Sequence, residues 1–289
     1  MVFMSDDNLS ASARNESDTI VIKVGTKVIT NKKGYLDMEQ IQNLARQIND
    51  LKKYYKRIIL VTSGAVAAGR EVLGKKARKI ESVSTQQLYS AAGQVPLMEA
   101  YRQALKNCIQ EGSKEDPLVA YQLLLTRHNF SSKKECKNIR GFIERAFAEK
   151  KEGIVIMNEN DPVATDELED GTKFSDNDHL TEHISSMMKA RMAVLLSDNG
   201  ICEDPNEPNT IIREIEPGSN GHKKHLRPGK SKLTRGGIID KDKYATQMQE
   251  QGIDVHVANG RTENVIPRIL VNGEKGISTH YKPADVRTV

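Results

Sequence analysis

Short apolar runs alternate with longer amphipathic stretches in the first quarter of the chain. Residues 19–24 (TIVIKV) are mostly β-branched and are followed by a glycine, which is typical of a strand buried on both faces. Apolar residues then recur every three or four positions over 37–55, which predicts an amphipathic helix. A second buried strand is expected at 57–61 (RIILV), and the turn 62–65 leads into a helix over 66–73. This β-α-β-α order predicts an α/β fold with a mostly parallel sheet covered by helices.

The alternation continues along the rest of the chain. Amphipathic spacing predicts four more helices, at 88–104, 139–150, 179–190 and 240–251. Runs of apolar residues predict four more strands, at 118–125, 153–157, 191–196 and 253–258. Gly93 and Pro96 indicate a break within the third predicted helix, and 261–270 fits either a helix or an extended segment. A chain of 289 residues with this pattern is long enough for one large α/β domain or for two lobes.

Two regions lack this periodicity. Residues 1–18 are polar and carry several acidic side chains, which fits neither a secretory signal nor a transit peptide. We interpret them as a disordered N-terminal tail, so that the folded part is expected to span 19–289. Residues 203–235 are rich in Gly, Pro, Asn, Lys and His, and we expect a mobile loop region there.

Composition and charge exclude several classes of protein. Forty-three Lys and Arg residues against 39 Asp and Glu give a formal net charge of +4, which is too small to predict nucleic-acid binding. Three cysteines without CxxC spacing exclude a disulfide scaffold and a cysteine zinc site. No apolar run approaches the roughly 20 residues that a membrane span needs. We therefore expect a soluble cytoplasmic protein with no membrane or nucleic-acid partner.

Small and polar residues follow four of the predicted strands. These segments are Gly25-Thr26, 62–69 (TSGAVAAG), 158–161 (NEND) and 197–200 (SDNG). The carboxyl ends of parallel strands meet at one edge of an open α/β sheet, and ligands bind outside that edge. The four segments are therefore expected to line one polar crevice.

Two turns and two lysines in this set suit an anionic ligand. Ser63-Gly64-Ala65 and Arg235-Gly236-Gly237 each enter a helix, where backbone N–H groups and the helix dipole favour phosphate or carboxylate. Lys23 lies in a run that should be buried, and Lys241 follows the second turn. Phosphoryl transfer needs positive charge and in-line positioning, and the segment Asp176-Asn177-Asp178 offers a carboxylate that could hold both ammonium groups. Neither GxxxxGK[ST] nor GxGxxG occurs at these turns, so a Walker A loop and a dinucleotide fingerprint are not expected.

Each of these features also has an ordinary structural explanation. Most basic side chains are solvated, so Lys241 taken alone predicts little. Residues 158–161 and 176–178 fit turns and helix caps, and Gly64 and Gly69 fit close packing. The seven histidines are interpreted as surface or core residues, and no metal-ligand set is expected from protein side chains. The functional interpretation depends on the joint occurrence of the motifs at strand ends.

Several strings along the chain resemble the glutamate 5-kinases of the amino acid kinase family. They are TIVIKVGT (19–26), VTSGAVAAG (61–69), AAGQVPL (91–97), LLLTR (123–127), MNENDPVA (157–164) and SDNDHL (175–180). The resemblance extends from about Thr19 to His280, and it is looser between Cys202 and Arg235. It implies the family's three-layer αβα sandwich around a central, mostly parallel sheet.

The resemblance also implies a reaction and a set of site residues. The reaction is transfer of the ATP γ-phosphoryl group to the side-chain carboxylate of L-glutamate, which gives L-glutamyl 5-phosphate in the first step of proline biosynthesis. Catalytic charge stabilisation would fall to Lys23, Lys241 and Asp178. Glutamate binding would fall to Ser63, Gly64, Ala65, Asn158, Asp161 and Asn177, with Asp161 pairing the α-ammonium group. ATP binding would fall to Lys23, Gly25, Ser197, Asp198, Gly236, Gly237 and Lys241, and Gly25 and Gly64 would offer backbone N–H groups to the phosphates and the reacting carboxylate.

Partners and organisation follow from the same resemblance. Mg²⁺ would arrive with ATP and be bound through its phosphates, and no protein side chain is expected as a metal ligand. An amino-acid-binding lobe is expected over about 19–190 and a nucleotide-binding lobe over about 191–289, without a C-terminal PUA domain. A homo-oligomer (dimer or tetramer) and functional coupling to a glutamyl phosphate reductase are further expectations.

The nucleotide side departs from the family pattern. The glycine-rich loop usually reads GTGGMxTK, whereas residues 234–241 read TRGGIIDK, and the nucleotide segment that begins at Ser197 is shortened and lacks a tyrosine. Two alternatives therefore stay open. One is a non-catalytic or regulatory glutamate-binding relative, and the other is an amino acid kinase with a different acceptor.

Overall fold

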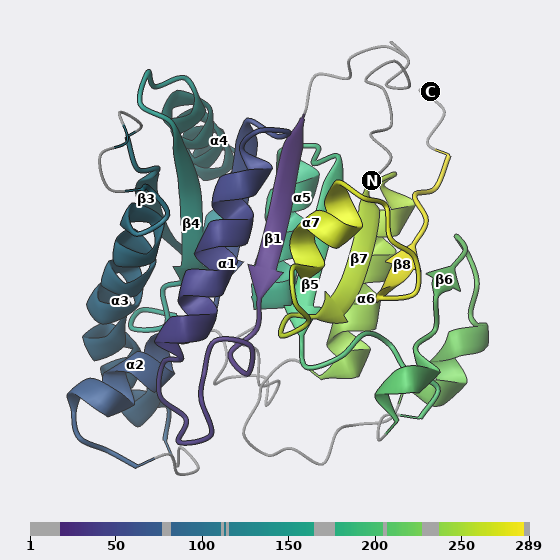
Figure 1. Cartoon of the computed structure of the whole chain (residues 1–289), viewed down its shortest axis with the longest axis horizontal. Coiled ribbons are helices and arrows are strands. Elements are labelled where there is room, and N and C mark those ends of the chain that lie inside the picture. The colour runs from purple at the N-terminus through teal and green to yellow at the C-terminus, as the bar shows by residue number, and fades with distance from the viewer. Residues whose placement is uncertain are drawn as a thin grey trace.

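A single sheet of eight strands crosses the molecule in the order β3-β4-β2-β1-β5-β7-β8-β6 (Figure 1). This computed structural model describes residues 18–76, 82–110, 113, 116–164, 177–204, 207–226 and 237–285. The strands are β1 (Thr19–Val24), β2 (Arg57–Thr62), β3 (Val119–Leu125), β4 (Gly153–Glu159), β5 (Met192–Ser197), β6 (Glu214–Ile215), β7 (Asp254–Asn259) and β8 (Ser278–Tyr281). All neighbouring strands are parallel except β7 and β8, which run antiparallel.

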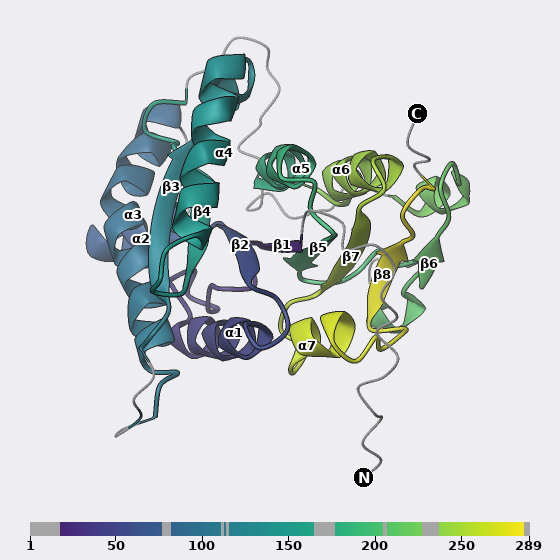
Figure 2. The same ribbon diagram turned by 90° about the horizontal axis from the view of Figure 1, so that it is seen from above.

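Helices cover both faces of the sheet, which confirms the predicted three-layer α/β architecture. They are α1 (Met38–Leu51), α2 (Ala65–Val72), α3 (Val83–Lys106), α4 (Lys133–Phe147), α5 (Asn177–Met187), α6 (Ile238–Glu250) and α7 (Val265–Leu270). Seen from above, α1 and α7 lie on one face of the sheet, and α5 and α6 lie on the other (Figure 2). No helix in the described ranges is long and apolar enough to cross a membrane.

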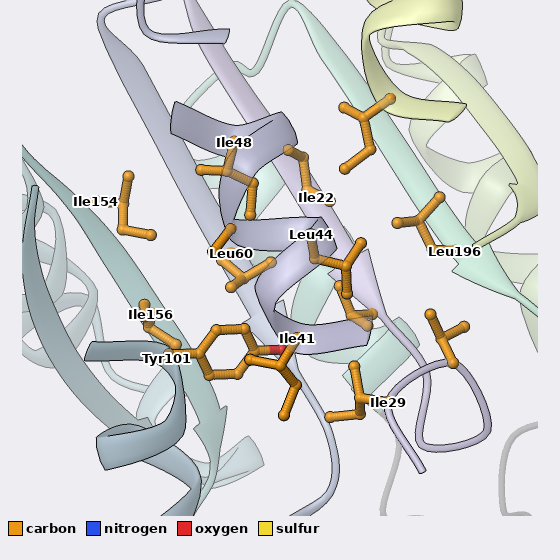
Figure 3. Packing of buried hydrophobic residues seen from close by; sticks show 14 of the residues in the cluster. Ile22, Ile29, Ile41, Leu44, Ile48, Leu60, Tyr101, Ile154, Ile156 and Leu196 are labelled. Atoms are coloured by element: carbon orange, nitrogen blue, oxygen red, sulfur yellow. The ribbon is translucent and has the colours of Figure 1, made fainter. Parts of the chain in front are cut away.

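The central strand β1 shows how the layers position a charged side chain. Successive side chains of a strand point to opposite faces. Ile20 and Ile22 accordingly pack in the core beneath α1, where Ile41, Leu44 and Ile48 meet them (Figure 3). Val21 packs on the opposite face, in the core that includes α4 and α5. Lys23 shares the face of Val21, so the strand directs its ammonium group toward α5.

Most predicted elements exist, with shifted ends. The first strand matches 19–24, and the predicted helices at 37–55 and 66–73 are α1 and α2. The segment 261–270 resolves as a loop followed by α7. Residues 1–17, the larger part of the predicted tail, lie outside the described residues.

The predicted break near Gly93 and Pro96 is wrong, because α3 is one helix from Val83 to Lys106 with Pro96 inside it. Proline removes one hydrogen bond of the helix, and packing on both sides of it keeps the helix continuous. Leu97 and Tyr101 are buried beneath α1. Gly93 lies against α2, where a Cβ atom would be 1.8 Å from the carbonyl oxygen of Ala65. The glycine therefore serves close packing rather than a helix end.

The predicted mobile region at 203–235 contains regular structure in its described part. Cys202 and Ile211 form an isolated β-bridge, and β6 pairs with β8 while Ile215 is buried. Two short 3-10 helices, Pro208–Thr210 and Gly221–His225, complete this part. Strand β6 is only two residues long and β8 only four. Periodicity gives no signal at such lengths, so neither strand was predicted.

Candidate active site

The carboxyl ends of β1, β2, β4 and β5 lie at the same edge of the sheet, the lower edge in Figure 1. Val24 pairs with Thr62 and with Leu196, and Val61 pairs with Met157, so the four strands end nearly level. The polar segments that follow them are therefore neighbours, as expected for one crevice.

Two lysines from different elements meet on one carboxylate at this edge. The Nζ atom of Lys23 lies 2.5 Å from Oδ1 of Asp178, and the Nζ atom of Lys241 lies 3.5 Å from Oδ2 of the same residue. Asp178 is in the first turn of α5, and Lys241 is in the first turn of α6. All three residues are buried. Two positive charges facing one negative charge give this trio a net charge of +1.

The surroundings of Asp178 keep its carboxyl group ionised. Burial acts to raise its pKa, but the opposing charges of Lys23 and Lys241 outweigh burial and lower the pKa below its ordinary value. A buried carboxylate is stable only when it is paired in this way. The ionised group in turn fixes the positions of both ammonium groups, so that they face the same space.

Asn177 connects two other predicted substrate residues, Asn158 and Ser63. Its amide nitrogen donates to the side-chain oxygen of Asn158 at 3.1 Å and to the hydroxyl of Ser63 at 2.9 Å. It also reaches the carbonyl oxygen of Thr62 at 3.1 Å. The ends of β2 and β4 are thus tied to the start of α5. Asn158 and Asn177 are buried, so this network is held away from solvent.

Asp161 is positioned by α3, a contribution that sequence reasoning missed. Its carboxylate accepts a hydrogen bond of 2.6 Å from the hydroxyl of Ser90 and one of 3.3 Å from the amide of Gln86. Gln94, within the string AAGQVPL, donates to the carbonyl oxygen of Glu159 at 3.1 Å. The three α3 residues lie four positions apart, on one face of the helix. The polar residues Gln86, Ser90 and Gln94, spaced by four in the sequence, were the pattern that could have indicated this polar face of the helix.

At Gly64 the backbone takes a left-handed conformation, and helix α2 begins at the next residue. Gly64 has a φ of +107°, and a Cβ atom there would lie 2.8 Å from Ile29, so glycine is required. Helix α2 begins at Ala65, where the first N–H groups lack acceptors within the helix. Gly69 one turn later lies against α3, where a Cβ would be 1.8 Å from the carbonyl oxygen of Tyr89. Close packing is therefore the structural role of Gly69.

The N–H of Gly25, expected to be offered to a phosphate, is bonded within the sheet in this structure. That N–H donates to the carbonyl oxygen of Leu196 at 3.0 Å, which joins the ends of β1 and β5. The place of its missing side chain is 3.2 Å from the same oxygen and 3.9 Å from Nζ of Lys23. Glycine thus leaves room beside the lysine.

The other predicted nucleotide residues are held by contacts of their own loops. The hydroxyl of Ser197 donates to the carbonyl oxygen of Asn199 at 2.6 Å. Asp198 accepts from Lys27 at 2.6 Å. Gly237 precedes α6, and its N–H donates to the carboxylate of Asp240 at 3.2 Å. Gly236 lies outside the described residues.

Sequence reasoning also overlooked a histidine pair on α5. His179 and His183 are four residues apart, and their rings lie 4.1 Å from centroid to centroid. Together with Glu182 they form a cluster whose ligand atoms lie within 4.8 Å of one another. A small, open pocket adjoins the two histidines and is also lined by Arg127, Phe130 and Glu159. The i,i+4 spacing of two histidines was readable from the sequence.

Comparison with known proteins places this geometry in a family. The amino acid kinase family model matches residues 18–259. A glutamate 5-kinase of Chlorobaculum tepidum is 36% identical over 258 residues, which cover 89% of this chain and 67% of the relative. A glutamate 5-kinase of Clostridium acetobutylicum is 34% identical over 256 residues, which cover 87% of this chain and 90% of the relative.

Solved structures share the fold at low sequence identity. Carbamate kinase from Giardia lamblia bound to AMP-PNP has a TM-score of 0.62 and 14% identity, covering 93% of this chain and 99% of that one. UMP kinase from Ureaplasma parvum has a TM-score of 0.52 and 16% identity, covering 93% of this chain and 100% of that one. At this low identity, the solved structures support the fold alone. The two glutamate 5-kinases, at 36% and 34% identity, support a place among the glutamate 5-kinases within the family. The chain belongs to the amino acid kinase family and, within it, to the glutamate 5-kinases.

Proposed function

We propose that the protein transfers the γ-phosphoryl group of ATP to the side-chain carboxylate of L-glutamate and so catalyses the first step of proline biosynthesis. The observation that carries the proposal is the meeting of Lys23 and Lys241 on Asp178, beside a network of buried amides, in a chain of this family. A carboxylate oxygen of glutamate forms a bond to the γ-phosphorus. The bond between that phosphorus and the bridging oxygen breaks, and ADP leaves with the electron pair.

The chemistry matches the side chains that are present. The nucleophile is a carboxylate, which is ionised at pH 7, so no general base is needed. The barrier comes from bringing two anions together and from the charge that spreads over the moving group. Lys23 and Lys241 stabilise that charge, and Asp178 holds their ammonium groups in place. This is catalysis by positioning and electrostatics.

The acceptor is held by the residues around the amide network. Ser63, Asn158 and Asn177 supply hydrogen-bonding groups for glutamate, and the buried carboxylate of Asp161 pairs with its α-ammonium group. The N–H groups at Gly64 and Ala65 face the reacting carboxylate at the start of α2. A negative charge near a helix N-terminus is favourable. The nucleotide lies on the side of Ser197, Asp198 and the turn at Gly237.

Mg²⁺ is proposed to enter with ATP. In the described residues the carboxylate at the centre of the site, Asp178, faces two ammonium groups, and the clustered ligand sets lie elsewhere. This donor set fits a metal held by phosphate oxygens rather than by the protein. When bound, the ion neutralises phosphate charge.

The proposal is tested by measuring ADP release with Mg-ATP and one of three acceptors: L-glutamate, L-aspartate or N-acetyl-L-glutamate. We expect turnover with glutamate alone. Turnover only with another acceptor would assign a different amino acid kinase. Calorimetry with glutamate and with Mg-ATP separately covers the remaining alternative, because glutamate binding without nucleotide binding or turnover would indicate a regulatory binding protein.

Other features stay predictions. The division into an amino-acid lobe (about 19–190) and a nucleotide lobe (about 191–289) is proposed on the same basis. So are the cytoplasmic location, the homo-oligomer and the functional coupling to a glutamyl phosphate reductase.

A further inference from the structure

The antiparallel pair β7 and β8 brings three side chains of metal-ligating types, one Asp and two His, to one face of the sheet. Asp254 and His256 are two positions apart on β7, so their side chains share a face. His280 on β8 lies directly opposite His256 in the register. Val255 and Tyr281, the residues next to them, point to the other face and pack in the core with α6. Two strands of a sheet thus fix the three side chains relative to one another.

The ligand atoms of these three residues converge on one point. Oδ1 of Asp254 lies 2.7 Å from Nε2 of His280 and 3.3 Å from Nε2 of His256. The two imidazole rings stack with centroids 4.4 Å apart and planes at 7°. One ligand atom from each residue lies within 4.8 Å of the others. A zinc ion with bonds of about 2.0–2.2 Å keeps tetrahedral ligand atoms roughly 3.3 Å apart, so small side-chain rotations admit it.

A hydrogen bond orients one of the two histidines. Nδ1 of His256 lies 3.0 Å from the hydroxyl oxygen of Ser278, on the neighbouring strand. Metal-binding histidines commonly use the second ring nitrogen in this way, which holds the ring and leaves the other nitrogen for the metal. When an ion binds, the proton of His256 resides on Nδ1 and is donated to the hydroxyl oxygen of Ser278, so that the lone pair of Nε2 is available to the ion.

The charge of the three side chains and their access to solvent both suit a metal cation. Asp254 supplies an anionic oxygen ligand beside two imidazole nitrogens, which suits a divalent cation. The side chains of Asp254 and His280 are 28% and 27% exposed, so an ion and a water ligand have access from solvent.

We propose that Asp254, His256 and His280 bind a divalent transition-metal ion of the zinc type, with water in the remaining coordination position. Two imidazole nitrogens and one carboxylate oxygen favour such an ion over Mg²⁺, which prefers oxygen ligands. The site is separate from the kinase centre. Asp254 begins β7, opposite Met192 at the start of β5, whereas the kinase centre lies at the carboxyl ends of the strands. The ion would cross-link β8 to β7 and so stabilise the attachment of β8, and of the neighbouring β6, to the rest of the sheet.

The cluster on α5 is the main competitor for the same ion. It offers His179, Glu182 and His183. The positive charge of Arg127, which lies close enough to perturb both histidines, opposes a metal cation there. Glu182 already accepts a hydrogen bond of 3.0 Å from Gln251.

Equilibrium dialysis against ZnCl₂ with elemental analysis tests the site in the full chain. We expect one tightly bound zinc per chain and a rise in Tm of about 5 °C at zinc concentrations 100 times the Kd. His280→Gln should weaken zinc binding roughly 10–100-fold, while its kinase activity with Mg-ATP shows that it is folded. A double variant, His179→Gln with His183→Gln, should keep the zinc. Zinc that survives His280→Gln, or that only the double variant loses, would overturn the proposal.

A measurement on the unaltered chain covers the case in which His280→Gln does not fold. Diethyl pyrocarbonate modifies free imidazoles, and peptide mass spectrometry gives the rate at each histidine. Zinc should slow modification of His256 and His280 at least tenfold and leave the exposed His128 unchanged. Equal rates at His256 and His280 with and without zinc would exclude the site.

Discussion

The proposed glutamate half and the proposed nucleotide half of the active site are held in different ways. In the proposed glutamate half, Asn177 and Asp161 are buried and are fixed by hydrogen bonds with residues far away in the sequence. In the described part of the nucleotide half, Ser197 and Gly237 bond within their own loops. The pair between Lys27 and Asp198 is 41% and 58% exposed. The residues proposed to hold the acceptor are therefore fixed by the fold, whereas those on the proposed nucleotide side rely on short local contacts.

This difference has a physical consequence for substrate choice. Buried polar groups are costly when they lose a partner, so a pocket built from them rejects ligands that leave a group unsatisfied. Local contacts at a surface exchange easily with water and constrain a ligand less. We therefore expect strict selection of the acceptor, and larger effects from substitutions in the glutamate half than from those in the nucleotide half.

The largest effect is expected at the residue that both halves share. Lys23→Ala should lower kcat about 10³-fold, because its charge acts mainly on the moving phosphoryl group in the transition state. The KM for glutamate should change much less. Lys137→Ala on the exposed side of α4 is the matched control. An unchanged kcat in steady-state assays would remove Lys23 from the mechanism.

A smaller effect, confined to glutamate, is expected at the centre of the amide network. Asn177→Ala removes the hydrogen bonds to Asn158, to Ser63 and to the carbonyl oxygen of Thr62, which tie the ends of β2 and β4 to α5. Loss of a buried hydrogen-bond partner costs about 1–3 kcal/mol, which predicts a rise of roughly 10–100-fold in the KM for glutamate. The KM for ATP should stay within a factor of about two. Asn138→Ala, exposed on α4, controls for loss of an amide. An equal rise in both KM values would mean that the two halves are not independent.

Local patterns predicted the sheet, while the site needed tertiary information. Lys23 stood out because a lysine within a β-branched run must find a partner in the interior. The strand ends indicated one crevice because parallel strands align their carboxyl ends. By contrast, Gln86 and Ser90 act on Asp161 across more than 70 positions of the chain. No local pattern specifies that pairing.

Three misjudged elements, α3, β6 and β8, have the same kind of cause, which is packing or pairing with distant parts of the chain. Pro96 breaks an isolated helix, but burial of Leu97 and Tyr101 outweighs the lost hydrogen bond in α3. Strands β6 and β8 are too short for a period of two to be recognised, and they exist because β6 pairs with β8 and β8 pairs with β7.

Residues 227–236, which include Gly236, lie outside the described part of the chain, so the glycine-rich turn stays a prediction.

The two halves are also expected to differ in how much the free energy of unfolding falls when a glycine near each of them is replaced by alanine. Gly69→Ala would place a Cβ 1.8 Å from the carbonyl oxygen of Tyr89, so α2 and α3 must move apart. We expect a loss of about 1–3 kcal/mol in the free energy of unfolding. Gly221→Ala, beside the nucleotide half, meets nothing within 4 Å and should change stability by less than about 0.5 kcal/mol. Urea unfolding measures both, and equal losses would contradict the packing argument.

The smallest effect is expected at the edge of the nucleotide half. Lys27 lies 2.6 Å from Asp198, and its hydrogen bond outweighs the effect of burial and lowers the pKa of that carboxyl. Exposed pairs of this kind contribute only about 0.2–1 kcal/mol and weaken in salt. Lys27→Ala should therefore raise the KM for ATP no more than about fivefold, with the KM for glutamate unchanged and the difference reduced at high salt. Lys53→Ala, which removes an exposed pair with Asp50 elsewhere, is the control. A rise far above tenfold in the KM for ATP would show that the nucleotide half depends on this contact as strongly as the glutamate half depends on its buried amides.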